Sequence, residues 1–190
     1  GNSQTSPKLA NLNVEYGKLP PQAVDLEEAV LGAIMLEKDA VLSVLDILKP
    51  ESFYKDAHQK IYKAIVDLSM EEKAIDILTV TEELKKRNSL EEVGGPLYIT
   101  QLTSKVASAA HLEFHARIIQ QKYIQRELIR VSSDIQRKAF DETMDVDDLL
   151  DQAESDLFEI AEGNIKKETA KINVLVKQAI HQIEESPTFS

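Results

Sequence analysis

The sequence predicts an all-α protein: a compact helical head, followed by a long antiparallel helical hairpin and a separate C-terminal linker helix. Apolar residues recur at spacings of three and four along most of the chain, which is the helical period. Only 6 Gly and 6 Pro occur in 190 residues. Residues 108–140 contain neither, so one helix of about 50 Å fits this stretch. That length exceeds the core of one small domain, which indicates an extension from the head.

Composition limits the classes of function. The apolar content of 43% is enough for a hydrophobic core. The chain has no Cys, which excludes disulfides, thiolate metal sites and a cysteine nucleophile, and fits a cytoplasmic protein. No apolar run approaches the roughly 18 residues that span a bilayer, and the polar N-terminus lacks a signal-peptide pattern. A formal net charge of -11 opposes binding of a phosphate backbone through bulk electrostatics.

The N-terminal half predicts a tail and a head. Residues 1–18 are polar and aperiodic, which is typical of a disordered tail. Residues 19–105 predict five or six short helices packed as the head. In the first helix Asp25 is an N-cap or first-turn acid, and one broad face is apolar: Leu26, Ala29, Val30, Ala33, Ile34 and Leu36.

Capping residues mark the later helices of the head. Asp39 and Asp56 are candidate N-caps for the next two helices. Thr79, with Glu82 three residues later, has the spacing of a capping box. Two carboxylate pairs are interpreted as ordinary surface charges: Glu27 with Glu28, and Glu71 with Glu72.

Residues 106–163 predict the hairpin. Its first arm carries an apolar stripe of Ile124, Leu128, Val131 and Ile135. After a short polar link, a second stripe follows: Val146, Leu149, Leu150, Ala153, Leu157 and Ile160. Because the link is short, the arms are expected to run antiparallel. Two such stripes are more apolar surface than the arms can cover alone, which indicates assembly with another molecule.

Residues 164–171 are polar and predict a hinge before the linker helix, residues 172–186. That helix has one apolar face, which predicts a docking surface: Ile172, Leu175, Val176, Ala179, Ile180 and Ile183. A helix of this length is marginal alone in water, so its face needs cover. Docking onto another molecule and docking back onto the hairpin both fit the periodicity. In a chain without a receiving domain, we expect this face to be covered by a second copy or disordered.

Motifs for catalysis or metal binding are weak. No phosphate-binding GxxxxGK[ST] loop is present. His111 and His115 have the i, i+4 spacing of metal ligands, but Glu113 does not follow the first His directly as the zinc-protease motif requires. The acidic run from Asp145 to Asp151 lacks the Gly and Glu of a calcium loop, and it reads as the acidic start of a helix.

From Pro20 onward the chain resembles the N-terminal region of the bacterial replicative DNA helicase of the DnaB type. The resemblance covers about 165 residues and rests on the order and spacing of several stretches rather than on one motif. These stretches are PPQAVDLEEAVLGAIML (20–36), PESFYKDAHQKIYKAI (50–65), AIDILTVTEEL (74–84), LEEVGGPLYITQLT (90–103), SAAHLEFHARIIQQKYIQRELI (108–129), DLLDQAESDLFEIAE (148–162) and INVLVKQAIHQIEE (172–185).

The resemblance implies an N-terminal assembly and primase-recruiting region of a hexameric replicative helicase, acting in DNA replication. In that family, hairpins pair between subunits, and three dimers form a collar on the helicase ring. The collar recruits primase and, in some systems, a helicase loader. The helix after the hinge docks on the ATPase domain of the neighbouring subunit.

By the same resemblance, ATP and Mg belong to a RecA-like ATPase domain, which this chain is expected to lack. The parent protein resembles an ATP-dependent DNA helicase, whereas no catalytic site, metal or cofactor is expected in this segment. DNA is expected to meet the parent ring rather than this segment. The residues expected at the hairpin seam or at the primase contact are Ile118, Ile119, Tyr123, Ile124, Leu128, Leu149, Leu150 and Leu157.

Three other readings compete with this one. The first is a generic all-α dimerisation module, which the helical periodicity of apolar residues alone is enough to support. A helical nucleic-acid-binding domain is opposed by the acidic charge and by the missing basic, aromatic-interleaved patch. A metal-dependent enzyme would have to use His111 and His115.

Overall fold

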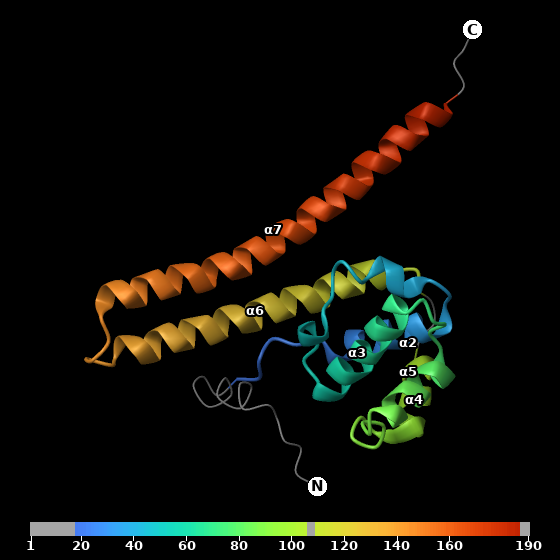
Figure 1. Ribbon diagram of the computed structural model, residues 1–190, viewed down its shortest axis with the longest axis horizontal. Helices are drawn as coiled ribbons and strands as arrows, with labels where there is room; N and C mark the ends of the chain where they lie inside the picture. The colour runs from blue at the N-terminus through green and yellow to red at the C-terminus, as the bar shows by residue number, and fades with distance from the viewer. Residues whose placement is uncertain (1–17, 106–108, 187–190) are drawn as a thin grey trace. The chain divides into compact units, whose positions relative to one another are not determined.

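The computed structural model describes residues 18–105 and 109–186, apart from the side chains of 165–171, and all regular structure in these ranges is helical. Its α-helices are α2 (Val24–Leu36), α3 (Asp56–Met70), α4 (Ile77–Lys86), α5 (Gly95–Ser104), α6 (Leu112–Ala139) and α7 (Val146–Glu185), with 3-10 turns at Ala40–Ser43 and Pro50–Ser52 (Figure 1). The all-α prediction is confirmed. The predicted tail lies, except for residue 18, outside the described residues.

The chain forms two compact units, residues 1–130 and 131–190, which we call the head unit and the arm unit. The boundary falls inside α6. None of the described helices is long and apolar enough to cross a membrane.

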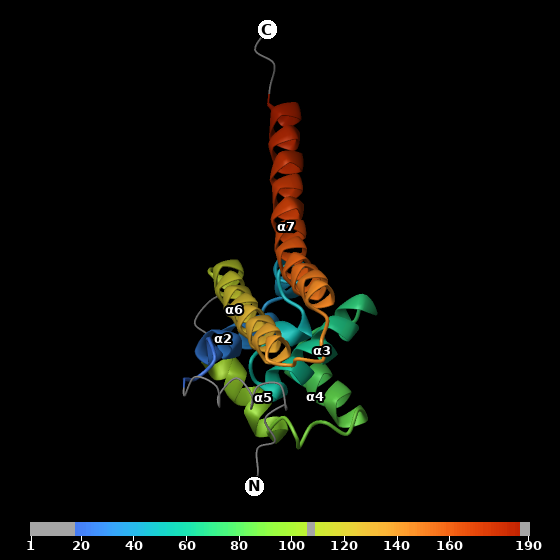
Figure 2. The same ribbon diagram turned by 90° about the vertical axis from the view of Figure 1, so that its left-hand side faces the viewer.

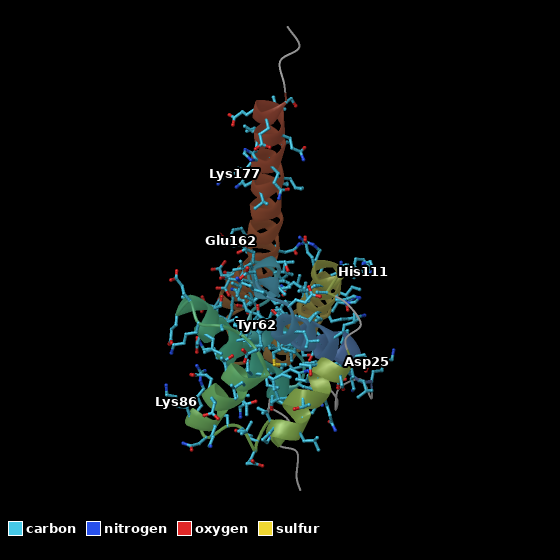
Figure 3. All side chains as sticks on the ribbon, turned by 90° about the vertical axis from the view of Figure 1, so that its right-hand side faces the viewer. Asp25, Tyr62, Lys86, His111, Glu162 and Lys177 are labelled. Carbon is cyan, nitrogen blue, oxygen red and sulfur yellow. The ribbon has the colours of Figure 1, made fainter. Side chains whose placement is uncertain are left out.

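In the head unit, helices α2 to α5 gather around one hydrophobic core (Figures 1 and 2). Helix α2 is apolar on nearly every side and packs against α5 and α3. Tyr62 of α3 lies fully buried among these helices (Figure 3). Its hydroxyl donates a hydrogen bond to the Leu48 carbonyl at 3.0 Å, which satisfies the one polar atom that this large ring brings into the core.

The first turns of α6 complete the head core. Leu112, Ala116 and Ile119 are buried in the same cluster as the residues of α2 and α3. Their spacing of four and three residues places them on one helix face. The compact head unit therefore extends to residue 130, beyond the limit of 105 that composition and turn residues suggest.

The helix caps differ in part from the predicted ones. Helix α4 begins after Asp76, not Thr79: the Asp76 carboxylate accepts from the Thr79 backbone N–H at 2.8 Å, and the Thr79 hydroxyl oxygen accepts from the Asp76 N–H at 2.9 Å. Thr79 is thus the third helical residue of a reciprocal cap. Asp39 adopts φ 62° before a 3-10 turn and makes no side-chain cap. Asp56 is the first residue of α3, where its charge suits the helix dipole.

The arm unit contains the end of α6, the link and α7. Lys138 Nζ donates to Gln152 Oε1 at 2.9 Å, so the two helices run antiparallel on either side of the link, as predicted. Asp145 caps α7, because its carboxylate accepts from the backbone N–H groups of Asp147 and Asp148 at 2.9 and 3.1 Å. The acidic run is therefore a helix start, as the sequence indicates.

The predicted hinge at residues 164–171 is wrong, and so is the separate linker helix. Helix α7 continues without a break from Val146 to Glu185. The segment was assigned to a hinge because it is polar, but Lys, Glu and Ala are strong helix formers and the stretch contains no Pro. A polar stretch therefore does not by itself mark a break in a helix.

Gly163 is the least favourable residue for a helix in this part of α7. A Cβ added to it meets no atom within 4 Å. We expect Gly163→Ala to stabilise α7 by about 1 kcal/mol, since Ala loses less backbone entropy than Gly in a helix. Thermal melting followed by helical circular dichroism measures the effect, and Asn164→Ala, at an exposed neighbour that is not Gly, is the matched control with a smaller gain. A Gly163→Ala chain that melts earlier would contradict a continuous helix.

Candidate protein-interaction site

The first half of α7 separates the predicted seam residues into two classes. Leu149 is half-buried, whereas Leu150 and Leu157 are 62% and 43% exposed. Adjacent helical positions point about 100° apart, so Leu149 and Leu150 cannot serve one face equally. Leu150 and Leu157, seven residues apart, share a stripe with Val146, which is also exposed. We call these three residues the α7 stripe.

The predicted seam residues on α6 occupy different environments in the head unit. Ile119 is buried in the head core, so its side chain is not available to a partner. Ile118, Tyr123 and Ile124 are half-buried, and Leu128 is exposed. Of the predicted seam residues on α6, Leu128 is therefore the most exposed.

The predicted docking face of the linker stretch is fully formed and uncovered. All six of its residues are exposed in the C-terminal part of α7: Ile172, Leu175, Val176, Ala179, Ile180 and Ile183. Figure 3 shows side chains, among them that of Lys177, standing out all around this part of the helix. We call these six residues the arm face. Large apolar side chains exposed together in this way mark a site of interaction.

The two histidines singled out by their spacing lie at the start of α6. The ring centroids of His111 and His115 are 6.3 Å apart. Within residues 18–105 and 109–186, no group of three or more His, Cys, Asp or Glu side chains is placed to hold a metal ion.

Sequence reasoning missed a buried polar network in the head unit. Glu27, interpreted above as a surface charge, is 1% exposed, and Glu28 is buried as well. The Glu27 carboxylate lies 2.7 Å from His58 Nδ1 and accepts from the backbone N–H of Tyr54 at 2.8 Å. His58 Nε2 lies 2.6 Å from the Tyr98 hydroxyl. The network connects α2, α3 and α5. Glu71 and Glu72, the other pair, are exposed as predicted.

The network has the residue types of an acid–base site but not its access. A His58 ring that donates a hydrogen bond from Nδ1 to Glu27 and accepts one at Nε2 from the Tyr98 hydroxyl satisfies every partner. His58 is 0% exposed, so no substrate reaches its ring. The arrangement therefore stabilises the head rather than performing chemistry.

A second buried polar group, Arg126, ties α6 to the rest of the head unit. Its guanidinium donates to the carbonyl oxygens of Pro21 at 2.8 Å and Ser52 at 3.0 Å. The rings of Tyr54 and Tyr123 lie 5.4 and 5.8 Å from it, within cation–π range. Burial lowers the pKa of Arg126, although the Glu27 carboxylate opposes that shift.

Three of the five tyrosines are expected to titrate late. Burial raises the pKa of Tyr98 and of Tyr123 to about 12, and it raises that of Tyr62 as well. In the unfolded chain a tyrosine ionises near pH 10. The stability gained from these neutral phenols is therefore complete below about pH 10 and lost as the pH rises towards 12. Ultraviolet titration of the phenolate should show a late class of tyrosines whose ionisation is coupled to unfolding. A single class near pH 10 would contradict the burial.

Comparison with known proteins shows which family has this sequence and fold. Residues 19–121 match the family model described as the DnaB-like helicase N terminal domain. The replicative DNA helicase DnaB of Rhodothermus marinus is 40% identical over 97% of this chain and 19% of its own length. The replicative DNA helicase DnaC of Bacillus subtilis is 38% identical over 88% of this chain and 37% of its own length. The chain thus spans about a fifth to two fifths of these relatives.

Solved structures agree. The crystal structure of the N-terminal domain of DnaB helicase from Mycobacterium tuberculosis superposes with a TM-score of 0.70 at 34% identity, covering 74% of this chain and 99% of that one. A DnaB-like replicative helicase, described with its interactions with primase, gives 0.61 at 25% identity, covering 73% and 30%. The family model spans more than half of this chain, and the chain belongs to the family of DnaB-like helicase N-terminal domains.

Proposed function

We propose that this chain is the assembly and primase-recruiting region of a hexameric replicative DNA helicase. It acts in subunit dimerisation and collar formation during DNA replication, and so in the cytoplasm. The observation that carries this proposal is the exposed α7 stripe, which the chain itself leaves uncovered. A second copy supplies a matching apolar stripe, which closed two-fold assembly requires.

The proposed partners follow from the two apolar surfaces. The α7 stripe and Leu128 pair with another subunit or receive primase, and one structural neighbour is described together with its interactions with primase. The arm face docks on the ATPase domain of a neighbouring subunit, where ATP and Mg act. A helicase loader is a further partner of the ring, and DNA meets the ring rather than this region, whose net charge is -11.

Light scattering coupled to size exclusion over a wide concentration range tests the assembly. We expect dimers that rise to hexamers, and we expect Leu150→Glu combined with Leu157→Glu to lower the association constant at least about a hundredfold, because four carboxylates per dimer would be buried. Leu97→Glu is the matched control, since Leu97 is an exposed leucine of α5.

Two outcomes would overturn this assignment. Unchanged association of the double variant would remove the α7 stripe from the seam. If the chain stays monomeric at high concentration and the double variant binds primase as well as the unchanged chain does, the α7 stripe takes part neither in subunit pairing nor in primase binding. Primase binding is measured with the purified cognate primase on the same two variants.

A further inference from the structure

A groove opens on the head unit where the end of α2, the turn Ala40–Ser43 and the connection from α3 to α4 meet. Its volume is about 590 Å³, within the range of roughly 300–1,000 Å³ that is usual for ligand-binding clefts. The lining includes the buried side chains of Ile34, Met35 and Val41 and the partly buried Ile75. The groove is therefore apolar at its base.

Two leucines at the groove are unusually open to solvent. Leu36 is 52% and Leu42 61% exposed, and both line the groove. Exposed large apolar side chains gathered at one place mark an interaction surface.

The charges around the groove are mainly negative. Four carboxylates line it, against two lysines: Glu37, Asp39, Glu72 and Asp76, against Lys38 and Lys73. Lys73 is already engaged, since its Nζ lies 2.6 Å from Glu71 Oε2. Among the described residues, the side chains of Glu37, Asp39 and Glu72 form no hydrogen bond or ion pair. These carboxylates favour a basic partner.

The backbone of the connection is also open to pairing. Within the described part of the chain, Ala74 and Ile75 take part in no backbone hydrogen bond, and both line the groove. An extended peptide can use such groups for its own N–H and C=O.

We propose that this groove binds a short segment of a partner protein in which apolar side chains are flanked by lysine or arginine. The apolar base and the two leucines receive the apolar side chains, and the carboxylates of the rim receive the basic ones. A second copy of this chain would bring the same acidic rim against it, which like-charge repulsion opposes. A small molecule fits less well, because the polar groups lie at the rim and do not converge on the base. This surface is separate from the α7 stripe and the arm face.

Two synthetic peptides with the same leucine spacing, one with lysines and one with glutamates between the leucines, provide the test. Binding is measured by fluorescence anisotropy, and the site is located by methyl NMR shifts of Leu36, Leu42 and Ile75. We expect the lysine peptide to bind at least about tenfold more tightly than the glutamate peptide, with shifts at these three residues. Localisation matters because the acidic α7 also has exposed leucines.

Variants decide whether the groove is responsible. Leu42→Asp should weaken binding about tenfold through the lost apolar contact, and Glu37→Lys should weaken it severalfold. Leu97→Asp and Glu142→Lys, at exposed positions outside the groove, should leave it unchanged. Shifts confined to α7, equal binding of both peptides, no binding, or full binding by Leu42→Asp would each overturn the proposal. Light scattering on the same variants keeps this result apart from assembly, since none of them alters the α7 stripe.

Discussion

Arg126→Ala is expected to lower the free energy of unfolding of the head unit by about 3 kcal/mol. The change removes a charged donor from two carbonyl groups, those of Pro21 and Ser52, and leaves both without that partner. It also removes the cation between the rings of Tyr54 and Tyr123. Denaturant unfolding followed by tyrosine fluorescence measures the loss, because all five tyrosines lie within residues 1–130.

Two further variants make this result specific. Arg137→Ala is the matched control: Arg137 is exposed on the same helix and pairs with Asp134, so its loss should cost about 0.5 kcal/mol or less. Arg126→Lys should recover only part of the stability, since a single ammonium cannot bind both carbonyls and pack flat against two rings. If Arg126→Lys recovered the full free energy of unfolding, the positive charge alone would account for the stabilisation by Arg126.

Glu27→Ala is expected to destabilise the head unit by a similar amount, about 3 kcal/mol. Its carboxylate is an acceptor for the Tyr54 N–H and the partner of the His58 ring, which is 0% exposed, so the variant leaves a buried polar group without that partner. Glu71→Ala, at an exposed carboxylate whose partner is Lys73, is the matched control and should leave the free energy of unfolding nearly unchanged.

A double-mutant cycle with His58→Ala tests whether the network acts as a unit. Since each single variant already breaks the same hydrogen bond, the double variant should cost clearly less than the sum of the two. Strict additivity would show that Glu27 and His58 stabilise the head independently.

The sequence predicted the elements well because helical periodicity is local. It predicted the division between head and arm less well, because α6 is apolar on more than one face. The stripe through Ile124 and Leu128 indicates the apolar face of a hairpin arm. Ile119 lies on another face of the same helix and belongs to the head core. Periodicity shows that a face is apolar but not which surface covers it.

The buried polar groups could not be predicted from neighbours in sequence. Arg126 finds its acceptor at Pro21, and His58 finds Tyr98 40 residues away. One signal did exist for Glu27: it lies in a helix that is apolar on nearly every side, so a polar residue there has no solvent-facing surface to occupy. The continuity of α7 could not be predicted for a different reason, because a run of hydrophilic residues fits a helix as well as it fits a hinge.

An unbroken α7 fixes the rotational phase between its two apolar surfaces. At 100° per residue, Ile172 and Leu175 lie roughly 40° ahead of and 20° behind Leu150 around the helix axis. The six residues of the arm face together are centred roughly 50° ahead of Leu150, so both surfaces of this 40-residue helix overlap on one side. Inserting two residues after Gly163 would turn the arm face by roughly 200° and leave each surface intact. The arm face would then no longer overlap the side of the α7 stripe, so the continuous helix determines the angle between the two bound partners as well as their separation.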